Sequence, residues 1–325
     1  MLFNDNHIEP LKDESVLDAL IRHQHDVSYS CKIGHCQTCL LKCREGTISQ
    51  QAQVGLKATD VNQGFFLSCQ QPADSIKNAE HIDTKSLFVS AKVIGKKLCS
   101  KDVCRLRLEL PTQMYYHAGQ FINLKNKHGV SRSYSLASVP QLDRYLELHI
   151  RLMENGEMSY WIFDTLEVGE YIEIQGPIGS CFYTEINKQF NIVLIGTGTG
   201  AAPLYGIARD ALNAAHEGKI IFYHGVKHNS DLYLDSELNN LQLINKNFSY
   251  EPCTTQEINP KGLSGRCNDI ALENITNVNS TILYICGNPE MVADTKKRAY
   301  LKGISLDKIF TDPFDRKELR SKKRE

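Results

Sequence analysis

Four cysteines in the first quarter of this sequence have the spacing of iron–sulfur ligands. Cys31, Cys36 and Cys39 follow the pattern C-x4-C-x2-C, and Cys69 comes after a gap of 29 residues. This plant-type spacing suits a [2Fe–2S] cluster, which needs four thiolates that converge from one tight loop and one more distant strand. Gly34 lies in the loop and lets backbone N–H groups approach the sulfur atoms. The cysteines therefore predict a protein that carries electrons singly.

A zinc site and disulfides are the alternatives for these cysteines. Zinc ribbons usually contain two separate C-x2-C pairs, whereas this sequence has one. Eleven cysteines is an odd number, and residues 1–6 lack the basic and apolar stretches of a secretion signal. We therefore expect a cytoplasmic protein. Six further cysteines fit no ligand spacing and are expected to be ordinary thiols: Cys43, Cys99, Cys104, Cys181, Cys253 and Cys267.

Length and charge limit the remaining possibilities. A chain of 325 residues has room for two or three domains. Its formal net charge of −1 argues against a nucleic-acid partner, because phosphate binding needs concentrated basic surface. The sequence contains no run of about eighteen apolar residues, so we expect no membrane span. We also expect a monomer. Residues 316–325 form a basic tail to which we assign no function.

The first predicted domain, residues 1–83, surrounds the cysteine loop. Val16, Leu17, Leu20 and Ile21 lie on one face of a predicted helix, and Asp13 and Ser15 are candidate caps for its start. A small half-barrel of short strands packed on this helix suits the pattern. The apolar pattern then lapses into polar residues, where a linker is expected.

The second predicted domain, residues 87–187, has a period of two. Apolar and charged residues alternate over 104–110 and again over 146–152, which predicts an antiparallel barrel. In the third domain, residues 188–315, apolar strands at 192–195, 219–226 and 282–286 are separated by helical stretches. That rhythm indicates βαβ units and a parallel sheet.

Glycines directly follow the first apolar strand of the third domain. Such a loop before a helix can cradle a dinucleotide pyrophosphate. An ordinary Rossmann unit has a carboxylate about twenty residues further on, and here the corresponding strand ends in Phe222-Tyr223-His224-Gly225 without one. The loop therefore suits a different nucleotide-binding fold. Its candidate binding residues are Gly196, Thr197, Gly198 and Gly200.

Three further segments, taken with the cysteines and the glycine loop, carry a family resemblance. They are Arg132-Ser133-Tyr134-Ser135, then His149-Ile150-Arg151 with Gly156-Glu157-Met158-Ser159, and finally Cys286-Gly287-Asn288-Pro289. In this order they resemble the reductase components of multicomponent oxygenases, members of the ferredoxin reductase superfamily with an N-terminal ferredoxin. The resemblance covers nearly the whole chain. It implies a β-grasp [2Fe–2S] ferredoxin domain, an antiparallel flavin-binding β-barrel and a C-terminal parallel-sheet α/β nucleotide-binding domain.

The resemblance also implies roles for these residues. Arg132 would pair with the FAD diphosphate, Tyr134 would stack on the isoalloxazine and Ser135 would hydrogen-bond near N5. Cys286 would lie beside the nicotinamide. These side chains position the reacting rings, since no acid or base is needed. The second flavin segment would bind phosphate at a helix start through His149, Ile150, Arg151, Gly156, Met158 and Ser159. Gly287 completes the nicotinamide segment, and Phe314 would cover the second flavin face.

The function implied by the resemblance is electron transfer from NADH through FAD and the cluster to a terminal Rieske-type oxygenase or a small ferredoxin. Reductases of di-iron monooxygenases and of deoxysugar synthesis share the same modules. NADH is favoured over NADPH because 251–256 lacks the arginine that would bind a 2′-phosphate, although Lys227, His228 and Arg266 could substitute for it. An alternative of another class is a non-catalytic iron–sulfur redox sensor. Two departures from the family are Gln37, where glycine is common, and the eleven residues beyond Phe314.

Overall fold

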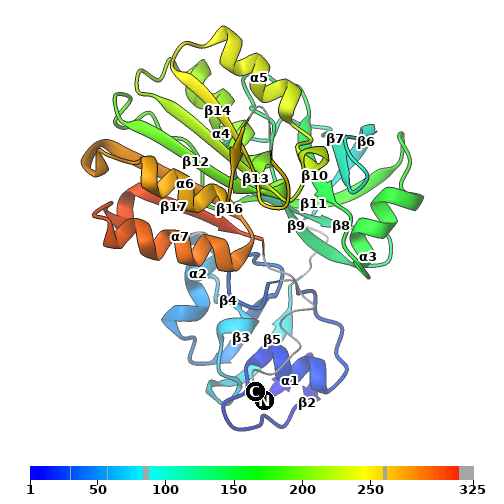
Figure 1. Cartoon of the computed structure of the whole chain (residues 1–325). Coiled ribbons are helices and arrows are strands. Elements are labelled where there is room, and N and C mark those ends of the chain that lie inside the picture. Colours follow the sequence, from blue (N-terminus) through cyan, green and yellow to red (C-terminus); the bar gives the residue numbers. More distant parts are fainter. Residues whose placement is uncertain (30, 57, 83–87, 259–261, 315–325) are drawn as a thin grey trace.

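The fold is described from a computed structural model, which covers the chain except residues 30, 57, 83–87, 259–261 and 315–325. Figure 1 shows three units in chain order: a small blue domain at the bottom, a barrel at the upper right and a helix-covered sheet at the upper left. The predicted boundary at 83–87 and the tail 316–325 lie outside the described residues. In the described part, no helix combines the length and the apolar character needed to cross a membrane.

The N-terminal unit is a five-stranded mixed sheet with a helix packed on it, as predicted. Ser15 caps the helix by accepting a hydrogen bond from the Asp18 N–H, and Leu17 and Leu20 are fully buried against Phe3 and Phe66. The strand order is β2-β1-β5-β3-β4, with β1 parallel to β5. The elements are β1 (Leu2–Phe3), β2 (Asn6–His7), α1 (Val16–Arg22), β3 (Leu40–Gly46), α2 (Ala58–Asn62), β4 (Phe65–Leu67) and β5 (Ile76–His81).

The middle unit is the predicted antiparallel barrel, with strand order β10-β7-β6-β11-β8-β9. Alternate residues such as Leu106, Leu108 and Leu148 fill its interior, so the period of two directs one face of each strand inward. A bridge between Leu136 and Leu148 joins the two edge strands. The elements are β6 (Val89–Leu98), β7 (Val103–Glu109), β8 (Phe121–Lys125), β9 (Ser131–Ser135), β10 (Leu146–Arg151), α3 (Glu157–Tyr160) and β11 (Tyr171–Ile178).

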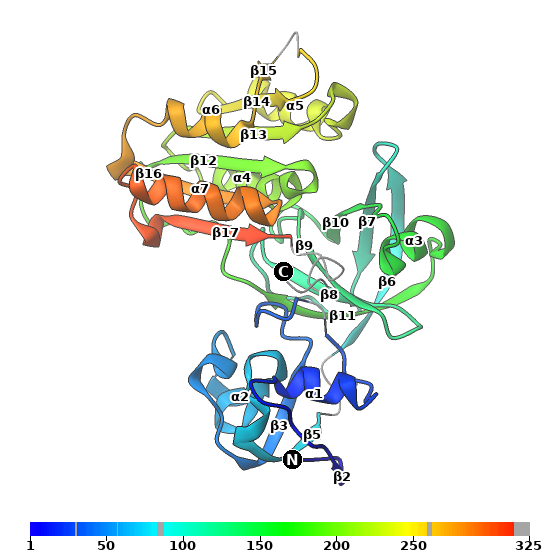
Figure 2. The same cartoon turned by 60° about the horizontal axis from the view of Figure 1, so that its bottom comes forward.

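The C-terminal unit is a six-stranded parallel sheet in the order β15-β14-β13-β12-β16-β17. Helices cover both of its faces, which Figure 2 shows with α4 behind the sheet and α7 in front. The elements are β12 (Asn191–Thr197), α4 (Ala201–Asn213), β13 (Ile220–Val226), α5 (Asp235–Ile244), β14 (Phe248–Thr254), β15 (Leu263–Ser264), α6 (Cys267–Asn274), β16 (Thr281–Gly287), α7 (Pro289–Leu301) and β17 (Ile309–Pro313).

Successive residues of the central strand β12 enter two different cores. Ile192 and Leu194 pack with α4 and α5, while Val193 and Ile195 pack with α6 and α7. A strand buried on both faces must be apolar at every position, which explains why the sequence of β12 is a continuous run rather than an alternation.

A buried polar network joins the barrel to the parallel-sheet domain. His149 in β10 lies 3.1 Å from Glu147 through Nε2 and 3.0 Å from the Tyr233 hydroxyl through Nδ1. Burial lowers the pKa of His149, and a neutral imidazole satisfies both contacts when Nε2 donates to Glu147 and Nδ1 accepts from Tyr233. Arg105 completes the link, because it donates to Glu237 in α5 at 2.6 Å and faces Glu147 at 3.7 Å.

The charge on Glu147 is the centre of this network. Burial alone would raise its pKa, but the hydrogen bond from His149 and the nearby Arg105 and Arg107 outweigh burial and lower the pKa to about 2. Its carboxylate is 2.7 Å from the Arg107 Nε. Because the folded-state pKa is below its ordinary value of 4.5, Glu147 stabilises the fold above about pH 4.5 and loses that contribution as the pH falls toward about 2.

We predict that Glu147→Gln lowers the free energy of unfolding at pH 7 by about 3 kcal/mol, because the mostly buried Arg105 and the partly exposed Arg107 lose a shared carboxylate partner. The deficit should shrink between about pH 4.5 and pH 2 as the wild-type carboxylate is protonated. Urea unfolding followed by the fluorescence of the single tryptophan, Trp161 in the barrel domain, measures it. Exposed Glu109→Gln on β7 is the control. A pH-independent deficit would contradict the assignment to charge.

Candidate functional site

The four predicted cluster cysteines come together at one edge of the N-terminal domain. The Cys31 and Cys36 thiols are hydrogen-bonded to each other, and so are those of Cys39 and Cys69. Cys69 does not lie on a strand, as the spacing had suggested, but in the 3-10 turn Ser68–Gln70 directly after β4. A [2Fe–2S] cluster takes two protein thiolates on each of its two irons, and two adjacent pairs of thiols match that arrangement. A single tetrahedral ion would not need its ligands to be grouped in two pairs. Among the described residues, no three His, Cys, Asp or Glu side chains form a site for one metal ion.

Backbone N–H groups of the loop point at the sulfur atoms. The Cys36 N–H is 3.2 Å from the Cys31 sulfur, and the Ile33 N–H is 3.4 Å from it. Gly34 has a φ of +83° and its N–H is hydrogen-bonded to the Cys69 sulfur. Donors of this kind stabilise negative charge on sulfur, so the loop is built for thiolates rather than thiols. The hydrogen bond from Cys31 also lowers the pKa of Cys36 to about 6.

Gln37 occupies a left-handed conformation, with a φ of +56°. This explains why glycine is common at this point of such loops, because glycine adopts positive φ without steric cost. The Gln37 side chain makes a contact that glycine could not make, because its Nε2 donates to the Gly55 carbonyl at 2.9 Å. The loop keeps its shape despite the departure.

The two segments predicted to bind the flavin meet beside the barrel. Arg132 in β9 is mostly buried, and its guanidinium lies 3.9 Å from Glu157 in the first turn of α3. A fixed cation next to a helix start, where N–H groups point outward, suits a diphosphate. The Tyr134 ring is partly buried against the barrel core, and this burial raises the pKa of its hydroxyl. The residues present therefore fit a dinucleotide flavin.

Some residues of the second segment already have internal partners. The Ser159 hydroxyl accepts from the Met153 N–H at 3.0 Å and donates to the Gly156 carbonyl at 2.9 Å. Met158 is buried in the barrel core. These contacts shape the turn before α3, so backbone groups are the ones that remain for a ligand. Arg151 donates to Asp102 at 2.9 Å and lies beside Gly198 of the glycine loop, where an added Cβ would be 3.3 Å from its Nη1.

One hydrogen bond connects the flavin segment to the nucleotide-binding sheet. The Ser135 hydroxyl donates to the Asp312 carboxylate at 2.6 Å. Asp312 is paired with Cys286 across β17 and β16, and Cys286 is paired with Gly196 across β16 and β12. The structure thus brings the Arg-x-Tyr-Ser segment, the cysteine segment and the first glycine of the loop into one continuous row.

Close backbone approach requires glycine at two positions of this row. A Cβ on Gly200 would lie 2.3 Å from the Cys286 carbonyl oxygen, and one on Gly287 would lie 2.5 Å from the Thr197 hydroxyl. Thr197 accepts from the Asn288 N–H at 3.1 Å, which holds the ends of β12 and β16 together. The Phe314 N–H donates to the Gly287 carbonyl at 2.7 Å, so the last described residue lies beside the same junction.

Three contributors to the site carry no sequence signal of their own. Buried Cys181 places its sulfur 3.9 Å from that of Cys286, and the His224 Nε2 donates to the Gly198 carbonyl at 3.0 Å. Burial lowers the pKa of His224 to about 4, so its imidazole is neutral at pH 7. Asn123, which contacts the Cys36 carbonyl, sits in a strand whose alternation indicates an outward position. The burial of Asn123 and Cys181 follows from packing between domains, whereas His224 is buried within the parallel sheet itself.

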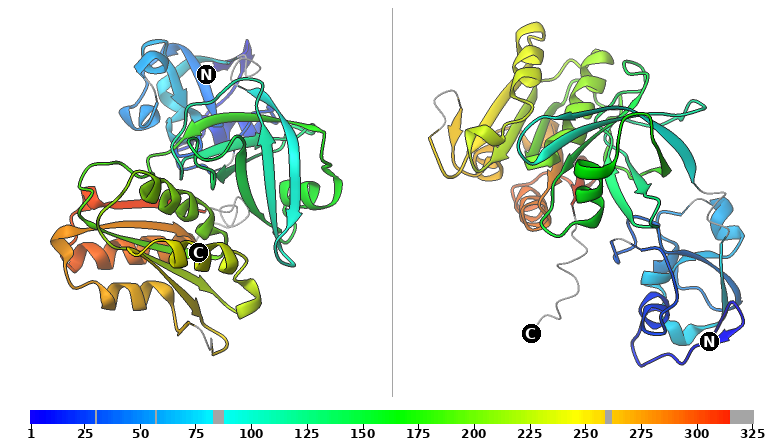
Figure 3. Two further views of the ribbon diagram at one scale, coloured as in Figure 1. Left: turned by 90° about the horizontal axis from the view of Figure 1, so that it is seen from above. Right: turned by 90° about the vertical axis from the view of Figure 1, so that its right-hand side faces the viewer.

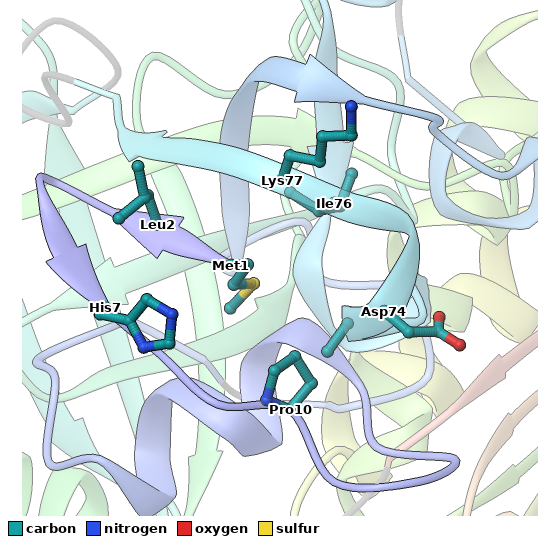
Figure 4. A pocket seen from close by; sticks show the side chains of 8 residues that line it. Met1, Leu2, His7, Pro10, Asp74, Ile76 and Lys77 are labelled. Atoms are coloured by element: carbon teal, nitrogen blue, oxygen red, sulfur yellow. The ribbon is translucent and has the colours of Figure 1, made fainter.

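A depression on the N-terminal domain lies away from these groups. Figure 4 shows it between the first strand and the start of β5. It shares no residue with the cluster loop, the flavin segments or the glycine loop, and we assign it no function. Its lining consists of Met1, Leu2, His7, Pro10, Ala73, Asp74, Ile76 and Lys77.

The chain matches three protein families in succession. Residues 4–74 match the 2Fe-2S iron-sulfur cluster binding domain, residues 90–183 the oxidoreductase FAD-binding domain, and residues 194–297 the oxidoreductase NAD-binding domain. The predicted architecture and the predicted binding of a [2Fe–2S] cluster, FAD and a nicotinamide dinucleotide are therefore confirmed at the level of the domains.

Relatives of similar length carry all three domains. The chain is 30% identical to the reductase subunit of an aromatic O-demethylase from Amycolatopsis, over 93% of this chain and 94% of the relative. It is 28% identical to CDP-6-deoxy-L-threo-D-glycero-4-hexulose-3-dehydrase reductase from Yersinia pestis, over 92% and 93%. Identity to the reductase component of the Pseudomonas putida naphthalene 1,2-dioxygenase system is 26%, over 92% and 93%. A crystal structure of an Amycolatopsis cytochrome P450 reductase superposes with a TM-score of 0.70 at 27% identity, over 96% of this chain and 97% of that one.

The cysteine pairs yield a prediction with a matched control. Cys69→Ser should abolish cluster assembly, because one iron loses a thiolate, whereas Cys43→Ser should not. Cys43 lies on β3 of the same domain, and its thiol is partly buried. Iron and sulfide content, together with the visible spectrum of anaerobically isolated protein, measures the outcome. Retention of a full cluster in Cys69→Ser would show that the fourth ligand lies elsewhere.

Proposed function

The chain belongs to the family of NAD(P)H-dependent flavoprotein reductases that carry a [2Fe–2S] domain, and on that premise we propose that it takes electrons from NADH and delivers them singly to a terminal Rieske-type oxygenase or its ferredoxin. The observation that carries this proposal is the row from Ser135 through Asp312 and Cys286 to Gly196. A flavin beside Ser135 and a nicotinamide beside Cys286 would then be held by neighbouring residues of this row.

We assign the cluster to Cys31, Cys36, Cys39 and Cys69. The cysteine loop supplies sulfur ligands together with N–H donors that disperse their charge. Cys36 and Cys39 are almost fully buried, while Cys31 and Cys69 are partly exposed. The two exposed ligands give electrons a route toward an external acceptor.

We assign the flavin to Arg132, Tyr134 and Ser135, with the start of α3 supporting its phosphates. Arg132 is always charged and offers a planar fork that matches phosphate oxygens. Its guanidinium donates to the Ser131 carbonyl at 2.8 Å and lies 3.9 Å from Glu157, which places its charge at the start of α3. Ser135 is oriented by Asp312 and presents its hydroxyl at a fixed place.

The nucleotide site is assigned to Gly196, Thr197, Gly198, Gly200 and the segment at Cys286. In a parallel sheet, ligands bind beyond the carboxyl ends of the strands, and the ends of β12, β13 and β16 meet here. When bound, the cofactors supply hydride transfer and single-electron transfer themselves. The protein's part is to exclude water, align the rings and hold Cys286 buried beside them.

The acceptor is assigned on the basis of relatives and of the chain's end. The naphthalene dioxygenase reductase component supports an oxygenase partner, as does the Asp312-Pro313-Phe314 ending. The deoxysugar reductase has a similar identity to this chain, so a partner in deoxysugar synthesis is the second candidate. The reductase component of a propane 2-monooxygenase supports a di-iron partner. Supplying purified protein and NADH to each class of acceptor, and measuring its turnover, decides among them.

The function itself is tested by the visible spectrum before and after NADH. We expect flavin and cluster bands that bleach together under anaerobic conditions. In Cys69→Ser, NADH should still reduce ferricyanide, which needs only the flavin, while cytochrome c reduction through the cluster should be lost. A cluster spectrum indifferent to NADH would support the sensor instead. Loss of both activities in a folded variant would contradict the modular division.

The preference for NADH yields a separate prediction. Thr255 follows β14 at the carboxyl edge of the sheet, and its N–H donates to the Val226 carbonyl at 3.2 Å. An arginine here would face the position of a ribose 2′-phosphate. Thr255→Arg should raise the ratio of NADPH to NADH activity, measured as kcat/KM, by about tenfold, since a charged hydrogen bond is worth about 1.5–3 kcal/mol. An unchanged ratio would show that the adenosine pocket does not lie at Thr255. Gln256→Arg, at the neighbouring residue, is the control.

A further inference from the structure

A buried asparagine of the barrel contacts the cluster loop directly. The Asn123 Nδ2 donates to the Cys36 carbonyl at 2.8 Å, which joins β8 to a residue 87 positions earlier in the chain. Asn123 is fully buried, and Cys36 is nearly so. Figures 2 and 3 show the N-terminal domain lying against the barrel on the side of β8 and β11. The contact therefore crosses the boundary between the two domains.

Asn123 is held rigidly from both sides. Its Oδ1 accepts from the Ser133 hydroxyl at 2.7 Å, and its Nδ2 also donates to the Gln175 Oε1 at 3.0 Å. Ser133, Asn123 and Gln175 are register partners across β9, β8 and β11, so they form one polar row on one face of the sheet. The amide orientation is fixed, because the Cys36 carbonyl and Gln175 oxygen can only accept.

The other side of the contact is the tightest part of the cluster loop. Cys36 donates its N–H to the Cys31 sulfur, and its own sulfur lies 2.9 Å from the Thr38 hydroxyl. The next residue, Gln37, has a positive φ and is tied to Gly55. The carbonyl of Cys36 is therefore part of a rigid unit, and a hydrogen bond to it fixes the whole loop.

The row belongs to the strand that carries the flavin segment. Ser133 lies between Arg132 and Tyr134, and Ser135 follows two positions later on the same strand face. One strand thus connects the group that orients the flavin to the groups that hold the cluster loop. This arrangement has no evident use in the stability of the barrel, whose core is made by the opposite face.

We propose that Asn123 is a positioning residue for internal electron transfer: it fixes the cluster loop against the flavin-binding barrel through the Cys36 carbonyl. This inference rests on the proposed function and deepens it. The hydrogen bond reaches a carbonyl rather than a sulfur, so it sets the distance and orientation of the cluster and leaves its electronic properties unchanged. Ser133 and Gln175 hold the amide in place.

The test is anaerobic stopped-flow mixing of the holoprotein with NADH, in which flavin reduction and cluster reduction are followed separately. In Asn123→Leu, which keeps the size of the side chain and adds no charge but cannot donate to the carbonyl, flavin reduction should be unchanged. Flavin-to-cluster transfer should slow by about tenfold, equivalent to about 1.4 kcal/mol. Lys125→Gln, on the same strand and paired with Glu173 at the surface, is the control and should stay within about twofold.

Two readouts separate positioning from a structural role. The EPR spectrum and midpoint potential of the cluster in Asn123→Leu should match those of the wild type, and Ser133→Ala, which keeps the donor, should retain most of the transfer rate. Equal transfer rates in Asn123→Leu and the wild type would overturn the proposal, as would a lost or altered cluster in both Asn123→Leu and the milder Asn123→Ser. If NADH fails to reduce the wild-type cluster at all, the proposed function fails instead.

Discussion

The hydrogen bond from the Ser135 hydroxyl to the Asp312 carboxylate is the contact on which the arrangement of this molecule depends. It joins the last residue of β9 in the barrel to β17 at the edge of the parallel sheet, across 177 positions of sequence. A hydride moves only between rings in van der Waals contact, so two separately folded domains must be registered to within a fraction of an ångström. A short charge-assisted hydrogen bond at the junction meets that need.

The buried network around Glu147 supports this registration from a distance. Glu147 and His149 belong to β10, whereas Tyr233 and Glu237 belong to the nucleotide-binding domain, so their contacts resist sliding of one domain on the other. Close packing acts in the same direction, because a Cβ on Gly206 in α4 would lie 3.0 Å from the Ala137 carbonyl of the barrel. Ionic and steric constraints together make the two larger domains a defined pair.

The N-terminal domain is joined in a different way. It has its own hydrophobic core, built around Phe3, Leu17 and Phe66, and its described bond to the barrel is the one from Asn123 to Cys36. The N-terminal domain thus meets the barrel through a buried polar contact, whereas the two larger domains share both an ionic network and close backbone packing.

Local pattern alone predicted the order of domains, the four candidate cluster cysteines, the apolar run of β12 and a helix cap at Asp13 or Ser15, because ligand spacing, hydrophobic period and capping act over a few residues. The spacing predicted Cys69 on a strand, and the structure places it in a turn. Only the tertiary structure decided that Asp312 meets Ser135, that Cys181 lies beside Cys286 and that Asn123 is buried. Each of these contacts joins segments at least 87 positions apart, and sequence period encodes which face a residue occupies but not which domain covers it.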